Sequence, residues 1–168
     1  VSALRGHRVA LIEKEGTLGG NLILGSVARH KRDIRKFITY LQAQVRRLGI
    51  EIQLGKEATG SMLDETNADV VVLATGSILQ LPSIPGIDKN NVITFADALT
   101  ETKDVKGRAI ILGGDEMGCE VAWFLAEEKK RPVTIIEIKD EIAAELNAIN
   151  RGYLLTKLKE LGVAVLLG

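Results

Sequence analysis

Short apolar runs, rich in β-branched residues, recur along the chain and predict six strands. Their apolar positions are continuous rather than alternating, which is typical of strands buried on both faces of a sheet. Amphipathic segments between several runs predict helices, and this alternation of strand and helix predicts an α/β fold with a parallel sheet. The expected strands are 9–12, 50–54, 70–73, 109–112, 133–136 and 163–167, and the expected helices are 32–48, 116–129 and 141–161, the last with a break near Gly152.

An internal repeat is the most informative feature of this pattern. The segment VALIE at 9–13 matches VTIIE at 133–137, and LGIEIQLG at 48–55 matches LGVAVLLG at 161–168. In the second copy an apolar run and a glycine-rich turn precede the matching strand, whereas the first copy has no counterpart of them. The second copy stops at Gly168, where the first continues to residues 68–76. We therefore expect a fragment that lacks segments at both ends, and the pattern leaves open one composite sheet or two incomplete ones.

The turn GGDEMG at 113–118 is the clearest chemical signal. In a dinucleotide-binding unit its first glycine permits the tight turn, the second admits a pyrophosphate to the backbone N–H groups, and the third lets helix and strand pack closely. Gly113, Gly114 and Gly118 are therefore candidates for nucleotide binding. Asp115 stands where the second glycine belongs, and its charge would repel a phosphate by about 1 kcal/mol or more. The residues leave two interpretations open, a nucleotide-binding turn or an aspartate-capped helix that binds nothing.

Acidic residues end the matching strands of the two copies. Glu137 lies where a carboxylate can accept hydrogen bonds from ribose hydroxyls, and it disfavours a 2′-phosphate, so NADH is preferred over NADPH. Glu13 holds the same position in the first copy, although a solvent-exposed acid is an alternative interpretation. Gly19, Gly20 and Asn21 follow Glu13; paired glycines leave room for a ligand, and an asparagine can donate or accept a hydrogen bond.

Two further candidate sites lie near the ends of predicted elements. Ala74, Thr75 and Gly76 follow the valine-rich run at 70–73, and ligands in parallel sheets bind at the carboxyl ends of strands. Glu120 lies one helical turn after the glycines, where it either contacts a ribose or supports the turn.

Composition and charge exclude several function classes. The 168 residues carry 22 basic and 22 acidic side chains, with a pI near 6.9, so no net charge attracts nucleic acid or an anionic membrane. The longest uncharged stretch, 70–87, contains two prolines and is not a spanning helix. The sequence has no recognisable signal peptide, and its single cysteine, Cys119, forms no internal disulfide, which favours the cytoplasm. Neither histidine has ligand-spaced partners, so no metal site is expected.

Taken in order, the motifs resemble the C-terminal flavin and nicotinamide-nucleotide region of NADH:flavin oxidoreductases. These are the old-yellow-enzyme-like reductases of the 2-enoate reductase and 2,4-dienoyl-CoA reductase type. The resemblance covers nearly the whole chain and rests on GHRVALIE at 6–13, LGGN at 18–21, ATG at 74–76, PG at 85–86, GGDEMGCE at 113–120 and the segments 142–151 and 158–163.

The resemblance implies a Rossmann-like parallel sheet or sheets with helices on both faces, in the two-nucleotide design of glutathione reductase. It implies a partial FAD-binding-like unit at 1–80, a connector at 81–106 and a partial NAD-binding-like unit at 107–168. Hydride would pass from NADH to FAD, and electrons would continue to FMN and a 4Fe-4S cluster in an N-terminal barrel absent from this sequence. No catalytic residue is expected in this chain, which alone should not reduce an enoate. The residues implied to face FAD are Glu13, Gly19, Gly20, Asn21, Lys31, Ala74, Thr75 and Gly76, and those implied to face NADH are Gly113, Gly114, Gly118, Glu120 and Glu137.

Two functions from other classes compete with this electron-input module. Because Asp115 replaces the middle glycine and the first FAD glycine turn is absent, the fragment is expected to hold FAD poorly or not at all. A degenerate ADP-binding or structural docking domain without redox activity is then the alternative, as in the similar trimethylamine dehydrogenase branch. A disulfide reductase of the glutathione or thioredoxin reductase type requires a redox-active cysteine pair, and Cys119 alone nearly excludes it.

Overall fold

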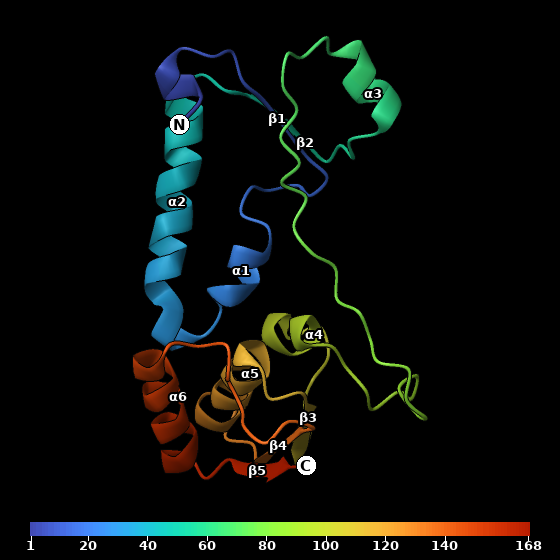
Figure 1. Ribbon diagram of the computed structural model, residues 1–168, viewed down its shortest axis with the longest axis vertical. Coiled ribbons are helices and arrows are strands. Elements are labelled where there is room, and N and C mark those ends of the chain that lie inside the picture. Colours follow the sequence, from blue (N-terminus) through green and yellow to red (C-terminus); the bar gives the residue numbers. More distant parts are fainter. The chain divides into compact units, whose positions relative to one another are not determined.

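The computed structural model describes all residues from 1 to 168, and they divide into two compact units, Val1–Pro82 and Ser83–Gly168. The first unit contains η1 (Ala3–Arg5), β1 (Ala10–Glu13), α1 (Asn21–Gly25), η2 (Arg29–Lys31), α2 (Arg32–Arg47), β2 (Glu51–Leu54) and α3 (Gly60–Glu65) (Figure 1). The second contains α4 (Phe95–Thr100), β3 (Ala109–Leu112), α5 (Glu116–Glu127), β4 (Val133–Glu137), α6 (Ala148–Glu160) and β5 (Ala164–Leu167).

Each unit builds its own parallel sheet. The first has two strands in the order β1–β2, and the second has three in the order β3–β4–β5. Helices connect the parallel strands, so the predicted Rossmann-like α/β class is confirmed. The hypothesis of one composite sheet is wrong, because the strands of each half pair only within that half.

The internal repeat is visible in the backbone. β1 pairs with β2, and β4 with β5, in the same parallel register, so that Glu13 and Glu137 are the last paired residues of their strands. The helix before each second strand leads into a glycine in the left-handed region, Gly49 with φ +64° after α2 and Gly162 with φ +71° after α6. This conformation favours glycine and turns the chain from helix into strand.

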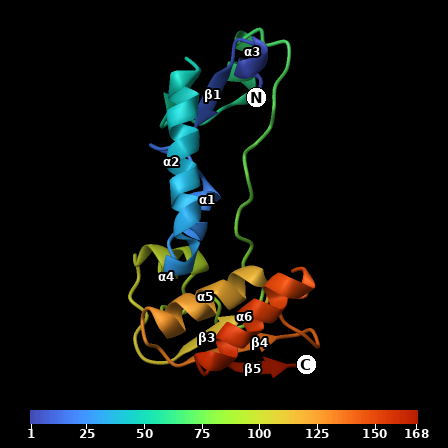
Figure 2. The same cartoon turned by 90° about the vertical axis from the view of Figure 1, so that its left-hand side faces the viewer.

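The core of the second unit is centred on α5. Its residues Val121, Trp123 and Phe124 are 2–5% exposed, and the helix packs against β4, α4, α6 and β3. Figure 2 shows α5 and α6 on the same face of the three-stranded sheet. Helices therefore cover one face of this sheet, not both as expected, and on β3 Ile110 and Leu112 stay 61% and 56% exposed. Burial on both faces was the wrong expectation for β3, where burial alternates along the strand.

The first unit has a much thinner core. Ala28 and Ile38 are its only buried apolar residues. The predicted strand at 70–73 is wrong, because these residues are extended but have no strand beside them to complete their backbone hydrogen bonds. Val70, Val72 and Leu73 are 77–80% exposed as a result.

The last helix begins later than the periodicity predicts. Asn147 caps α6, since its side chain accepts a hydrogen bond from the N–H of Asn150 at 3.0 Å. Residues 138–147 form an irregular loop instead of the expected first helical turns. The helix then runs through Gly152 without the expected break.

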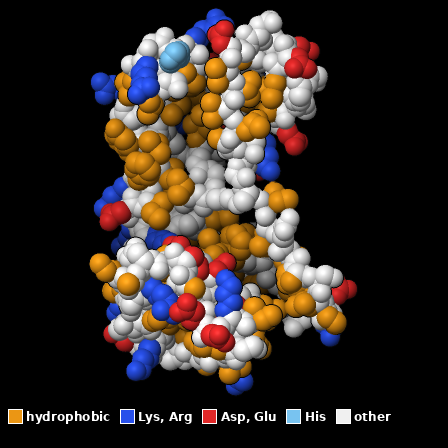
Figure 3. Space-filling view, in the orientation of Figure 1, with side chains coloured by type: hydrophobic (Ala, Val, Ile, Leu, Met, Phe, Trp, Pro, Cys, Tyr) orange, Lys and Arg blue, Asp and Glu red, His pale blue; other side chains and the backbone are white.

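The surface gives no sign of a dominant charge. Acidic and basic side chains are interspersed on the face drawn in Figure 3, in line with the balanced sequence. None of the helices combines the length and the apolar character that crossing a bilayer requires.

Candidate nucleotide site

The turn between β3 and α5 has the geometry that its glycines predict. Gly113 has φ +104°, a conformation that side chains rarely adopt, and its N–H donates to the carbonyl oxygen of Ile136 at 2.9 Å. A Cβ on Gly118 would lie 2.1 Å from the carbonyl oxygen of Gly113. Only glycine therefore allows the first turn of α5 to approach the end of β3 this closely.

Three backbone N–H groups of this turn lie where an anion binds at a helix N-terminus. Each already donates to a carboxylate of the chain: the N–H of Gly114 to Glu137 Oε2 at 2.6 Å, that of Gly118 to Asp115 Oδ1 at 2.8 Å, and that of Glu116 to Glu145 Oε1. The donors that a pyrophosphate would use are thus occupied by three carboxylates.

Asp115 is the N-cap residue of α5. Its backbone is extended, with φ −68° and ψ 179°, and its side chain accepts from the N–H three residues later. This is the capping role that the second interpretation of the turn expects, and such a cap stabilises a helix by about 1 kcal/mol.

The two strand-ending acids adopt matching conformations. Oε1 of Glu137 accepts a hydrogen bond from the N–H of Lys139 at 2.9 Å, and Oε1 of Glu13 accepts one from the N–H of Glu15 at 2.9 Å. The N–H groups of Lys139 and then Gly114 stabilise the carboxylate and lower the pKa of Glu137 below its ordinary value. Glu137 is therefore charged at neutral pH, as a ribose-binding acid must be to accept two hydrogen bonds.

The loop at 138–147 covers the turn. A Cβ on Gly114 would lie 2.4 Å from Cγ2 of Ile142, and the N–H of Ala143 donates to the carbonyl oxygen of Gly114 at 2.7 Å. Arg151 anchors the loop from α6, because its Nε donates to the carbonyl oxygen of Ile142 at 3.0 Å and its guanidinium pairs with Glu141 at 2.7 Å. The glycine at 114 thus makes room for this loop.

Cys119 lies beneath the same turn and is fully buried. Its Sγ donates to the carbonyl oxygen of Gly114 at 3.4 Å. Burial raises the pKa of the Cys119 thiol to about 12, and nearby carboxylates add to the shift: Asp115, Glu145, Glu120 and Glu137. The thiol stays protonated, and the cysteine packs as a small apolar residue. Glu120, the remaining predicted contact, lies on α5 immediately after it.

In the first unit, two predicted segments lie together. Nδ2 of Asn21 donates to Oγ of Ser77 at 3.5 Å, and a Cβ on Gly76 would lie 3.8 Å from the same Nδ2. Gly20 has φ +50° with open space beside its Cα, whereas Gly19 has φ +137° and packs against Ile23. The turn at 19–21 and the segment at 74–77 thus form one open, polar site.

The other predicted residues of this unit lie around that site in different ways. Ala74 and Thr75 are exposed in an extended segment, not at the end of a strand as expected. Lys31 lies at the N-cap position of α2, and Glu13 ends β1.

These features decide how well each nucleotide fits. The open backbone at Gly20 and Gly76, with the Asn21 amide between the two segments, fits a flavin nucleotide passing close to the chain. In the second unit Glu137 and Gly118 fit a dinucleotide, but Asp115 and Glu145 occupy N–H groups that its pyrophosphate needs.

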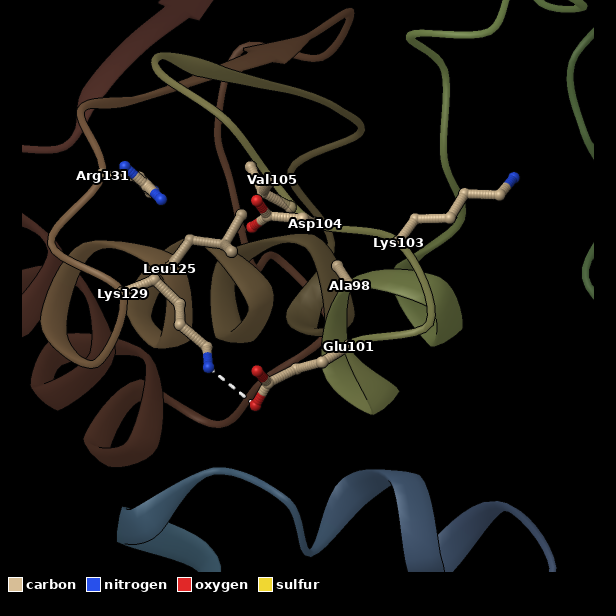
Figure 4. Close-up of a pocket in the computed structure, with 8 residues that line it drawn as sticks. All are labelled: Ala98, Glu101, Lys103, Asp104, Val105, Leu125, Lys129 and Arg131. Atoms are coloured by element: carbon tan, nitrogen blue, oxygen red, sulfur yellow. Dashed lines mark ion pairs between the residues drawn. The ribbon is translucent and has the colours of Figure 1, made fainter.

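A separate hollow lies at the other end of α5 (Figure 4). Lys129 points across it to Glu101, and the two form an ion pair of 2.7 Å between Nζ and Oε1. Nε of Arg131, also in its wall, is buried without a hydrogen-bond partner. None of the residues predicted to face a nucleotide lines this hollow, so it is not the candidate site.

Two residues of these sites were not predicted from the sequence. Glu145 was hidden because periodicity placed it inside a helix, and the signal that could have found it is the cap residue Asn147. Ser77 directly follows the Ala-Thr-Gly motif, and only the fold brings it to Asn21.

Comparisons with known proteins agree on one family. The family model described as pyridine nucleotide-disulphide oxidoreductase matches residues 1–168. The cinnamate reductase of Clostridium sporogenes is 42% identical over 142 residues, which are 84% of this chain and 21% of that protein. The NADH oxidase of Thermoanaerobacter brockii is 35% identical over 173 residues, covering 99% of this chain and 26% of that protein. The structure of a 2-naphthoyl-CoA reductase complex superposes with a TM-score of 0.90 at 30% identity, covering 99% of this chain and 25% of that one.

Proposed function

The chain belongs to the pyridine nucleotide-disulphide oxidoreductase family, and we propose that it is the electron-input module of an NADH-dependent flavin oxidoreductase. It spans about a quarter of the length of the relatives cited above. We therefore propose that it works together with a further domain, the barrel that carries FMN and a 4Fe-4S cluster. FAD in the first unit and NADH in the second are its proposed cofactors.

The observation that carries this proposal is the pair of matching strand-ending acids. Glu13 and Glu137 end equivalent strands in the same register, and each carboxylate is held by the N–H two residues further on. Oriented in this way, each carboxylate keeps lone pairs for ribose hydroxyls. Two copies of one ribose-binding arrangement support two nucleotides.

Bound NADH supplies a hydride and bound FAD accepts it, and the chain contributes binding and orientation. Glu137 binds the ribose of NADH and its charge repels the 2′-phosphate of NADPH. Gly118 keeps the N-terminus of α5 close to β3, where the helix dipole favours a phosphate. Asn21 and Gly76 line the flavin side, where Asn21 donates or accepts a hydrogen bond and the glycine leaves the backbone accessible.

A second candidate function follows from the occupied turn. Because Asp115 and Glu145 hold N–H groups of α5, a module that binds ADP or no nucleotide, and serves to dock on the barrel, is the competing proposal. It requires no electron transfer from this chain.

Flavin absorbance separates the two functions. The 168-residue chain is mixed with excess FAD, and visible absorbance is followed while NADH or NADPH is added without oxygen. The module predicts a protein-bound flavin spectrum that NADH bleaches faster than NADPH. Glu137→Gln should reduce this preference, whereas Asp140→Asn, which removes a charge from the neighbouring loop, should leave it unchanged. A colourless protein whose melting temperature responds only to ADP would support the binding module instead.

A further inference from the structure

We propose that Glu145 is a gate on the nucleotide turn: its carboxylate holds the N–H of Glu116, and a dinucleotide binds only after this side chain rotates away. The inference rests on the proposed function in taking NADH as the ligand of this turn. It concerns how readily the turn accepts a pyrophosphate.

Glu145 differs from the other two carboxylates at the turn. Glu137 belongs to the ribose-binding strand end, and Asp115 is the N-cap of the helix itself. Glu145 lies 29 residues from its partner and comes from the covering loop, and this contact is its only hydrogen bond. It adds an anion at the point where the ligand must place its own.

The surrounding structure allows the side chain to move while the loop stays in place. Ile142 and Ala143 fix the loop to Gly114, and Arg151 fixes it to α6. Glu145 itself is exposed, and its carboxylate contacts only the N–H of Glu116. Freeing the N–H of Glu116 therefore needs only rotation of the Glu145 side chain, which is a fast movement in exposed residues.

The gate acts on phosphate and not on the nucleoside. A carboxylate and a phosphate oxygen compete for the same N–H donor and repel each other, so a phosphorylated ligand must displace Glu145. Adenosine has no phosphate and does not need that donor. This difference gives the proposal a signature that general loosening of the loop would not produce.

The test measures dissociation constants for NADH, ADP and adenosine by isothermal titration calorimetry at one ionic strength. Wild type is compared with Glu145→Ala, Glu145→Gln and the control Asp140→Asn, which removes the same charge from the same loop. We expect Glu145→Ala to tighten NADH and ADP binding about twofold to fivefold, the range typical of one charged contact at a helix N-terminus. Glu145→Gln, which keeps an acceptor for the Glu116 N–H, should have a smaller effect, and adenosine affinity should stay constant. An NMR readout supports this: the Glu116 amide signal should move in Glu145→Ala and on ADP binding.

The outcomes separate the gate from the function. If wild type binds NADH and Glu145→Ala binds it no more tightly, the gate is wrong while the electron-input module stands. A second outcome is that Glu145→Ala binds ADP more tightly than wild type, but NADH binds no more tightly than ADP and bleaches no flavin. In that case the gate stands and the module is wrong. Equal tightening of adenosine, or no binding of any nucleotide to any variant, would overturn the gate.

Discussion

Asp115 should affect the stability of the chain and its nucleotide affinity in opposite directions. Its side chain caps α5 through a 2.8 Å hydrogen bond from the N–H of Gly118, and it stands where the family pattern of the turn has a glycine. Removing the cap with Asp115→Ala is expected to cost about 1 kcal/mol of unfolding free energy. Asp115→Asn keeps a capping acceptor, and Asp115→Gly costs only a few tenths of a kcal/mol, because both residues are good N-caps.

The nucleotide responds to the charge and not to the cap. A carboxylate about 4 Å from a phosphate charge repels it by about 1 kcal/mol at the dielectric constant of water and by more at a partly buried site. All three variants remove this charge and should bind NADH or ADP about fivefold more tightly. Asp115→Gly should gain most, because it also removes the side chain from the pyrophosphate position.

Urea unfolding, followed by circular dichroism, measures the stability effect, and calorimetric titration with ADP measures the affinity. The expected pattern is a loss of about 1 kcal/mol in Asp115→Ala, a much smaller loss or none in Asp115→Gly and Asp115→Asn, and a gain of affinity in all three. Weaker ADP binding in Asp115→Asn would refute the reasoning, since it would mean that the carboxylate helps to hold the ligand. Unchanged stability in Asp115→Ala would show that the cap contributes nothing.

Three further predictions concern the framework of the second unit. Gly118→Ala places a Cβ 2.1 Å from a backbone oxygen and should lower the unfolding free energy by about 2 kcal/mol or more. Gly152→Ala, which has open space around it inside α6, should raise the unfolding free energy by up to about 1 kcal/mol. Urea titrations of the two variants test this difference. Cys119, with its pKa raised to about 12, should resist iodoacetamide at pH 8 in the folded protein and react once urea unfolds it. The pKa of Asp97 is lowered to about 2, chiefly by the N–H of Thr94, so the carboxylate stabilises α4 fully above the ordinary pKa near 3.8 and loses this effect as the pH falls through about 2. NMR signals of the α4 amides should show this loss on acidification, and Asp97→Asn should remove the pH dependence.

The parts of the fold that sequence could predict are those with local, repeated signals. The α/β class and the family resemblance are confirmed, and the α5 segment of the second unit begins at its predicted residue. The match between residues 9–13 and 133–137 predicted equivalent strand ends, and the structure gives them the same register and the same carboxylate contact. These features could be predicted because each is determined by residues close to it in the sequence.

The parts that failed depend on partners far along the chain. Residues 70–73 have the composition of a strand, but a strand needs a neighbour, and β1 pairs only with β2. Apolar periodicity extended the last helix over Glu145, where the Asn147 cap and the packing of Ile142 on Gly114 hold the chain in a loop. The contact between Glu145 and the N–H of Glu116 was therefore not visible in the pattern.

The occupied turn links the two candidate functions physically. Backbone N–H groups at a helix N-terminus need an acceptor whether or not a ligand is present. Carboxylates of the chain accept these hydrogen bonds in the free protein. They therefore stabilise the closed state of the turn, and a dinucleotide must displace them in order to bind. The apparent dissociation constant of the dinucleotide is then the intrinsic one divided by the fraction of molecules in which the turn is open. If the proposed function holds, the combined strength of the Asp115 and Glu145 contacts at this turn sets whether the chain acts as an electron-input module or as a nearly inert docking domain.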